Sequence, residues 1–171
     1  HGPMVRGFAS GPRAIWEGLF RLLSSGQPMA LNLTQGSALV PGKAQGPLIG
    51  GNLSLMCHLV GTPFLPSFDG CILFMEDKGE ALYRVDRMLT HLKLSGCLDG
   101  IAGLAAGRFE GCDDRDALDR LFMDRISDLG IPLATGLPIG HGEENRALPL
   151  GVEAELDVDH MTLSVIDGCV A

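Results

Sequence analysis

The chain has 171 residues, of which 46% are hydrophobic and 20% charged, which suffices for one domain with a hydrophobic core. Its net charge of −8, with no basic run, argues against a nucleic acid or an anionic membrane as partner, because phosphates bind clustered lysines and arginines. No apolar stretch approaches the roughly 20 residues of a membrane span, so we expect no membrane segment.

The first residues predict a linker followed by a helix. Residues 1–11 are rich in glycine and start at His1 rather than at methionine, so we expect a linker from an upstream domain that this chain lacks. Residues 14–23 then place apolar side chains at helical spacing, and Pro12 suits the first turn of a helix. Residues 12–171 are expected to form one domain.

Short strands and a capped helix are predicted next. Residues 29–33 and 37–40 have the composition of strands, whereas residues 46–51 predict a turn-rich approach to Asn52. The side chain of Asn52 can cap a short helix over residues 53–59, since asparagine readily accepts hydrogen bonds from the first amides of a helix.

The middle of the chain alternates strands with helices. Residues 71–75 form an unbroken apolar run, which predicts a strand buried on both faces. The spacing of Asp77 and Glu80 predicts a capping box for an amphipathic helix over residues 80–95. Residues 101–106 predict a second buried strand, and residues 116–129 a second amphipathic helix that ends at Gly130.

The last third predicts a strand, a long loop and a hairpin. Residues 131–135 form the strand, and a loop over residues 136–146 follows it. Residues 147–156 and 161–165 alternate like an antiparallel hairpin. Together these elements predict a mixed α/β fold, with a mixed sheet and amphipathic helices in layers.

The cysteines and the glycine-rich segment give no sign of a metal or a cofactor. The five cysteines are dispersed without a C-x-x-C pair, so we expect buried free thiols in a reducing compartment and no zinc site. Residues 46–51 lack the lysine and hydroxyl residue of a phosphate-binding loop. The cysteines are Cys57, Cys71, Cys97, Cys112 and Cys169.

Two residues stand where catalytic groups are often found. Glu76 follows a buried strand, and the carboxyl ends of such strands collect functional groups in α/β folds. His141 lies between Gly140 and Gly142 in a polar loop, which suits a general base. Plainer alternatives are a helix-dipole charge for Glu76 and a solvated loop histidine for His141. No serine lies in a G-x-S-x-G motif, so the nucleophile of a triad is missing.

Several motifs in order resemble the C-terminal part of the LD-carboxypeptidases, and they run over nearly the whole chain. The opening residues 1–4 of this chain also resemble the segment of these enzymes that connects the two domains. The motifs are Gly50-Gly51-Asn52-Leu53, Gly61-Thr62-Pro63, Ile72-Leu73-Phe74-Met75-Glu76-Asp77, Tyr83-Arg84-Val85-Asp86-Arg87, Pro138-Ile139-Gly140-His141-Gly142 with Asn145, and Leu148-Pro149-Leu150-Gly151.

This resemblance implies a swivelling β/β/α domain and a serine peptidase with a Ser, Glu, His triad. Glu76 and His141 match the family's glutamate and histidine, and the serine belongs to an N-terminal domain. The family removes terminal D-alanine from cytosolic muropeptides during cell-wall recycling, commonly as a homodimer. For this chain we expect no cofactor. A related branch confers immunity to peptide–nucleotide antibiotics.

The sequence leaves the substrate contacts open. Arg84 and Arg146 are candidate partners for the substrate's terminal carboxylate, and Asn52 could line the pocket or merely cap its helix. By resemblance the protein is expected in the cytoplasm, with a muropeptide substrate and its own N-terminal domain as partners. A non-catalytic module that binds peptide or glycan is the alternative from another class of protein.

Overall fold

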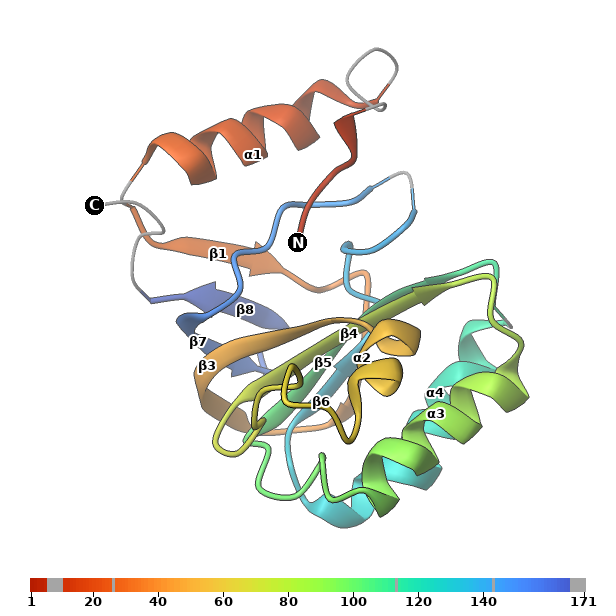
Figure 1. The fold of residues 1–171 in the computed structure, drawn as a ribbon. Coiled ribbons are helices and arrows are strands. Elements are labelled where there is room, and N and C mark those ends of the chain that lie inside the picture. Colours follow the sequence, from red (N-terminus) through yellow and green to blue (C-terminus); the bar gives the residue numbers. More distant parts are fainter. Residues whose placement is uncertain (6–10, 26, 113, 143, 167–171) are drawn as a thin grey trace.

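One mixed sheet with helices forms the body of the protein. The computed structural model describes residues 1–5, 11–25, 27–112, 114–142 and 144–166, and within them an eight-stranded sheet runs in the order β1-β8-β7-β3-β4-β5-β6-β2 (Figure 1). The strands are β1 (Met29–Asn32), β2 (Ser37–Val40), β3 (Lys43–Asn52), β4 (Ile72–Lys78), β5 (Gly103–Glu110), β6 (Leu133–Thr135), β7 (Val152–Asp157) and β8 (Thr162–Val165). The helices are α1 (Arg13–Ser24), α2 (Leu53–Leu59), α3 (Leu82–Leu94), α4 (Arg115–Ile126) and a 3₁₀ turn at Ser127–Leu129.

The centre of the sheet is parallel and its flanks are antiparallel. β3, β4, β5 and β6 pair in parallel, whereas β7, β8 and β1 continue one side and β2 the other side in antiparallel pairs. This arrangement confirms the mixed α/β fold expected from the sequence. The carboxyl ends of four parallel strands therefore meet at one edge, where functional side chains collect in such sheets.

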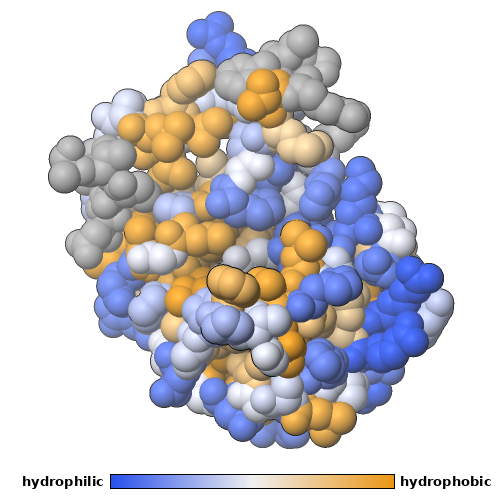
Figure 2. All heavy atoms as spheres, in the orientation of Figure 1, coloured by the Kyte–Doolittle hydropathy of each residue, from blue (hydrophilic) through white to orange (hydrophobic). Residues whose placement is uncertain are grey.

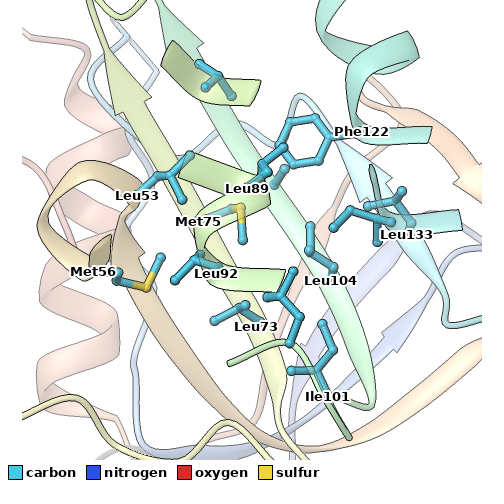
Figure 3. Packing of buried hydrophobic residues seen from close by; sticks show 14 of the residues in the cluster. Leu53, Met56, Leu73, Met75, Leu89, Leu92, Ile101, Leu104, Phe122 and Leu133 are labelled. Atoms are coloured by element: carbon cyan, nitrogen blue, oxygen red, sulfur yellow. The ribbon is translucent and has the colours of Figure 1, made fainter. Parts of the chain in front are cut away.

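Strand β4 is buried on both faces, as its unbroken apolar run predicts. Leu73 and Met75 point into a core under α2, α3 and α4, and Ile72 and Phe74 point into a second core on the other face. Figure 3 shows side chains of the first core converging from the sheet and from these helices. Because side chains alternate along a strand, Glu76 continues the face of Phe74 and Asp77 continues the face of Met75.

Helix α1 lies apart from the other helices, beyond β1 (Figure 1). It buries Ile15 and Trp16 but leaves Phe20 55% and Leu23 60% exposed. In Figure 2 apolar atoms gather over α1 and the strands beneath it, whereas the surface over α3 is mostly hydrophilic. In the described part of the chain, no helix is long and apolar enough to cross a membrane.

The glycine-rich segment before Asn52 is a strand, so the predicted turn over residues 46–51 is wrong. Gly46 and Gly50 have positive φ angles, and a Cβ atom on them would lie 2.1 Å from Gly70 O and 1.7 Å from Phe74 O. The glycines thus let β3 lie close to the backbone of Gly70 and of Phe74 in β4. In the sequence alone, the same glycines suggest a turn.

The predicted capping box at Asp77 and Glu80 is also wrong. β4 continues through Lys78, α3 starts at Leu82, and its N-cap residue Ala81 makes no side-chain cap. Asp77 instead accepts a hydrogen bond from the Ser54 amide, at the start of α2. The strand runs on because Asp77 and Lys78 still pair with Phe109 and Glu110 of β5, across a bulge.

The other predicted elements are confirmed with shifted ends. The Asn52 cap of α2, the helix ending at Gly130 and the antiparallel pairing of the final strands are as predicted. The predicted strand over residues 101–106 starts two residues later and extends to Glu110.

A charged pair joins the start of β3 to the end of β7. The hydrogen bond from Lys43 to Asp157 lowers the pKa of Asp157 to about 2.

Candidate active site

Three polar side chains meet at the carboxyl edge of the parallel strands. Asn52 at the end of β3 is the register partner of Glu76 near the end of β4. His141 comes from the loop that follows β6, the next strand but one in the sheet. The chain therefore brings together residues that are 24 and 65 positions apart in sequence.

Glu76 and His141 form a short hydrogen bond. His141 Nδ1 lies 2.7 Å from Glu76 Oε2, and the carboxylate side chain is only 1% exposed whereas the imidazole is 35% exposed. Since Nδ1 faces the carboxylate, it carries the proton that is donated, and Nε2 is left as an acceptor. The exposed imidazole can therefore take a proton from a group outside, while the buried carboxylate fixes its tautomer and orientation.

Glycines leave the space that this pair occupies. A Cβ atom on Gly140, whose φ is +130°, would lie 3.2 Å from Glu76 Oε2, and one on Gly107 would lie 3.2 Å from Glu76 Cβ. The backbone on both sides of the carboxylate is thus packed too closely for side chains. The glycine before His141 thus leaves room for the Glu76 carboxylate beside the loop.

Asn52 does more than cap its helix. Its Oδ1 accepts from the Leu55 amide, whereas its Nδ2 donates to Asp77 Oδ1 at 2.9 Å and to Glu76 Oε1 at 3.4 Å. One amide group therefore bridges two neighbouring carboxylates that point to opposite faces of β4. A contact of Asn52 with substrate stays a prediction.

No nucleophile accompanies the pair among the described residues. Within the described residues, the His141 ring forms its hydrogen bond with Glu76. Burial raises the pKa of the Cys57 thiol to about 11 and also raises that of Cys71 and Cys112, so these thiols are not activated. The described cysteines are free, but only Cys71 is buried and the other three are partly exposed; Cys169 lies outside the described residues.

The two arginines predicted to bind substrate lie in different places. Arg84 is on the outer side of α3, where it pairs with Glu80 at 3.4 Å and lines a groove with His58 and Tyr83. Arg146 lies in the loop of His141 and pairs with Glu144 at 2.8 Å. Of the two arginines, only Arg146 lies in the loop that carries His141. A substrate contact of either arginine stays a prediction.

Sequence reasoning missed Arg108, which lies against the loop that carries His141. Arg108 follows the buried part of β5, its guanidinium lies 3.5 Å from Glu144, and its side chain packs against Gly142. Its position just after a buried strand is the same signal that singled out Glu76, so the sequence could have indicated it.

A buried carboxylate that orients an exposed imidazole at the edge of an α/β sheet is an arrangement typical of hydrolases. Residues 45–156 match the family described as the LD-carboxypeptidase C-terminal domain. This match covers more than half of the chain, and the chain belongs to that family.

Individual relatives agree with this assignment. A putative carboxypeptidase of Synechocystis is 40% identical over 97% of this chain and 56% of its own length. The microcin C7 self-immunity protein of Escherichia coli is 28% identical over 74% of this chain and 38% of its own. A crystal structure of muramoyltetrapeptide carboxypeptidase from Oxalobacter formigenes superposes with a TM-score of 0.81 at 31% identity, over 99% of this chain and 61% of that one.

The chain spans about half the length of these curated relatives. The comparisons therefore establish the family and the fold of this chain, which corresponds to one part of those longer proteins.

Proposed function

We propose that this chain is the C-terminal domain of a serine-type LD-carboxypeptidase, whose serine lies in an N-terminal domain outside these 171 residues. The observation that carries the proposal is the 2.7 Å hydrogen bond between the buried Glu76 and the exposed His141. The motif order and the family match support it. Residues 1–11 are then the linker between the two domains, and residues 12–171 are the domain.

The proposed reaction uses the pair as a base and its orienter. His141 Nε2 takes the serine proton as the serine oxygen bonds to the carbonyl carbon before the terminal D-alanine. The C–N bond then breaks, and His141 returns the proton to the leaving amine. Water repeats the same steps on the acyl-enzyme and releases the shortened peptide. Glu76 stabilises the imidazolium each time it forms.

The proposed substrate is a muropeptide that ends in D-alanine, consumed in the cytoplasm during cell-wall recycling. The relative from Oxalobacter formigenes carries the name muramoyltetrapeptide carboxypeptidase, which supports this class. The terminal carboxylate of the substrate needs a cation, and Arg146 is better placed than Arg84 because it shares the loop of His141. A homodimer is the proposed assembly, in line with the family resemblance.

The antibiotic-immunity branch is the second candidate function. The similarity to the microcin C7 self-immunity protein favours it, because that protein is also a relative over most of this chain. The two candidates share the same catalytic pair and differ in the group that leaves.

Release of D-alanine tests the proposed function. The longer protein that contains this chain is expected to release D-alanine from murein tetrapeptide and to leave the matched tetrapeptide ending in L-alanine intact. D-Alanine is measured with a D-amino acid oxidase assay. Cleavage of a peptide–nucleotide antibiotic instead would favour the immunity branch. Binding of muropeptide without any cleavage would favour the non-catalytic module and contradict the proposal.

A further inference from the structure

The first two residues of the chain lie beside the loop that carries His141. The backbone nitrogen of His1 donates to Leu148 O at 2.9 Å, and the Leu148 amide donates back to His1 O at 2.8 Å. Figure 1 shows this start of the chain next to the segment that leads into β7. Two reciprocal hydrogen bonds fix the register of His1 and Gly2 against the loop.

Asn145 joins this segment to the residue before His141. Its Oδ1 accepts from the Gly140 amide at 3.1 Å, and its Nδ2 donates to Gly2 O at 3.2 Å. Gly140 is also the residue whose Cβ position lies 3.2 Å from Glu76 Oε2. A single amide side chain thus fixes the backbone that sets how far the imidazole lies from the carboxylate.

The side chain of His1 approaches the same carboxylate from the other side. His1 Nε2 lies 3.7 Å from Glu76 Oε1, whereas His141 holds Oε2. The His1 ring is 17% exposed and packs edge-to-face on Phe74, with 5.3 Å between the ring centroids. Glu76 therefore lies between two imidazoles, and its Oε1 faces His1 and Asn52.

A carboxylate orients an imidazole well only if its own rotation is restricted. Catalytic geometry has to be held within about 0.5 Å and 10–20°, which takes contacts behind the reacting groups. His1 restricts the carboxylate, and Asn145 restricts the loop of the imidazole. The two residues are linked through the start of the chain, because His1 is followed by Gly2, whose carbonyl accepts from Asn145.

We propose that His1 and Asn145 are positioning residues of the Glu76–His141 pair. The role rests on the proposed function, because positioning matters only if the pair is catalytic. Neither residue contacts the substrate in this proposal. The segment of residues 1–2, which sequence analysis assigned to a linker, is then part of the active site.

Three variants separate positioning from packing. His1→Phe keeps a ring against Phe74 but has no nitrogen near Glu76. Asn145→Asp keeps an acceptor for the Gly140 amide and loses the donor to Gly2 O, whereas Asn145→Ala loses both. Asn32→Ala is the control, because Asn32 is an exposed asparagine of β1 whose side chain accepts hydrogen bonds from Thr34, far from the Glu76–His141 pair in sequence.

The first measurement needs no activity. In a proton NMR spectrum of the 171-residue chain, the Nδ1 proton of His141 is expected at low field, identified by its loss in His141→Ala. His1→Phe and Asn145→Ala are expected to move or broaden this resonance, and Asn145→Asp to do so less. The control is expected to leave it unchanged, and the thermal midpoint reports folding of each variant.

The second measurement uses the longer protein and murein tetrapeptide. We expect His1→Phe and Asn145→Ala to lower kcat about 10-fold or more with little change in KM, because oriented groups act in the transition state. An unchanged resonance and an unchanged kcat in folded His1→Phe and Asn145→Ala would overturn the positioning role. If the resonance moves as expected but the tetrapeptide is not cleaved by the unaltered protein, the proposed function fails and the contact network stands.

Discussion

If the proposed function holds, replacing His141 with alanine is expected to lower kcat of the longer protein by about 10⁴-fold or more, the range found when a triad histidine is removed. Among the described residues, His141 is the one whose exposed imidazole forms a short hydrogen bond with the buried Glu76 carboxylate. Without it the serine keeps its proton and the leaving amine receives none. KM is expected to change little, because binding of the peptide does not require the imidazole. Steady-state release of D-alanine measures both constants.

Glu76→Gln tests the other half of the pair with a matched control. Glutamine keeps the size of the side chain but removes the charge that stabilises the imidazolium, so we expect kcat to fall by about 10³–10⁴-fold. The control is Asp77→Asn, which alters the adjacent buried carboxylate on the opposite face of β4. Asp77 contacts Ser54 and Asn52 rather than His141, so its loss should reduce stability and leave kcat within about 10-fold. Equal losses of kcat in the two variants would contradict the assignment of Glu76.

Gly50→Ala is expected to prevent folding or to destabilise the chain by more than about 4 kcal/mol, a range reserved for severe steric and packing defects. A Cβ atom at this position would lie 1.7 Å from Phe74 O and 2.6 Å from Phe74 C. Both atoms belong to the backbone of β4, which cannot move aside without breaking the pairing that places Glu76 beside Asn52. Since a domain of this size is stable by only about 5–15 kcal/mol, one such defect can unfold it.

Gly18→Ala is the control for this variant. Gly18 lies in α1, and a Cβ atom there meets nothing within 4 Å. Alanine should stabilise the helix by up to about 1 kcal/mol relative to glycine. Urea unfolding followed by circular dichroism compares the two variants. A Gly50→Ala chain with the unfolding midpoint of the unaltered protein would show that the close approach of β3 and β4 is not required.

The sequence predicted the elements whose signals are local. The apolar run before Glu76 predicted a buried strand, and Asn52 predicted a helix cap, because each pattern depends on a few neighbouring residues. Gly130 likewise predicted the end of a helix through its left-handed conformation. The α/β class followed from their order along the chain.

Elements that depend on distant partners were predicted wrongly. Residues 46–51 look like a turn because of their glycines, yet those glycines let a central strand approach Gly70 and Phe74. Asp77 looks like a cap for the helix that follows it, yet pairing with β5 extends the strand and turns Asp77 toward α2. The nearest helix in sequence was not the one that the side chain serves.

The candidate site shows the same division. Glu76 and His141 were singled out by their positions, and the structure places them in contact. The approach of His1 to Glu76 depends on hydrogen bonds to Leu148, which lies 147 residues away, so no local pattern could indicate it. Asn145 was noted only as part of the family motif, and its link from Gly140 to Gly2 required the structure.

Labelling with a phosphonate reagent that reacts with activated serines tests the central claim most directly. Mass spectrometry of the labelled longer protein should find one modified serine, outside residues 1–171, and the rate of modification should fall steeply in His141→Ala. Modification at a serine within this chain, or an unchanged rate without the imidazole, would show that this pair does not serve a hydroxyl group from another domain.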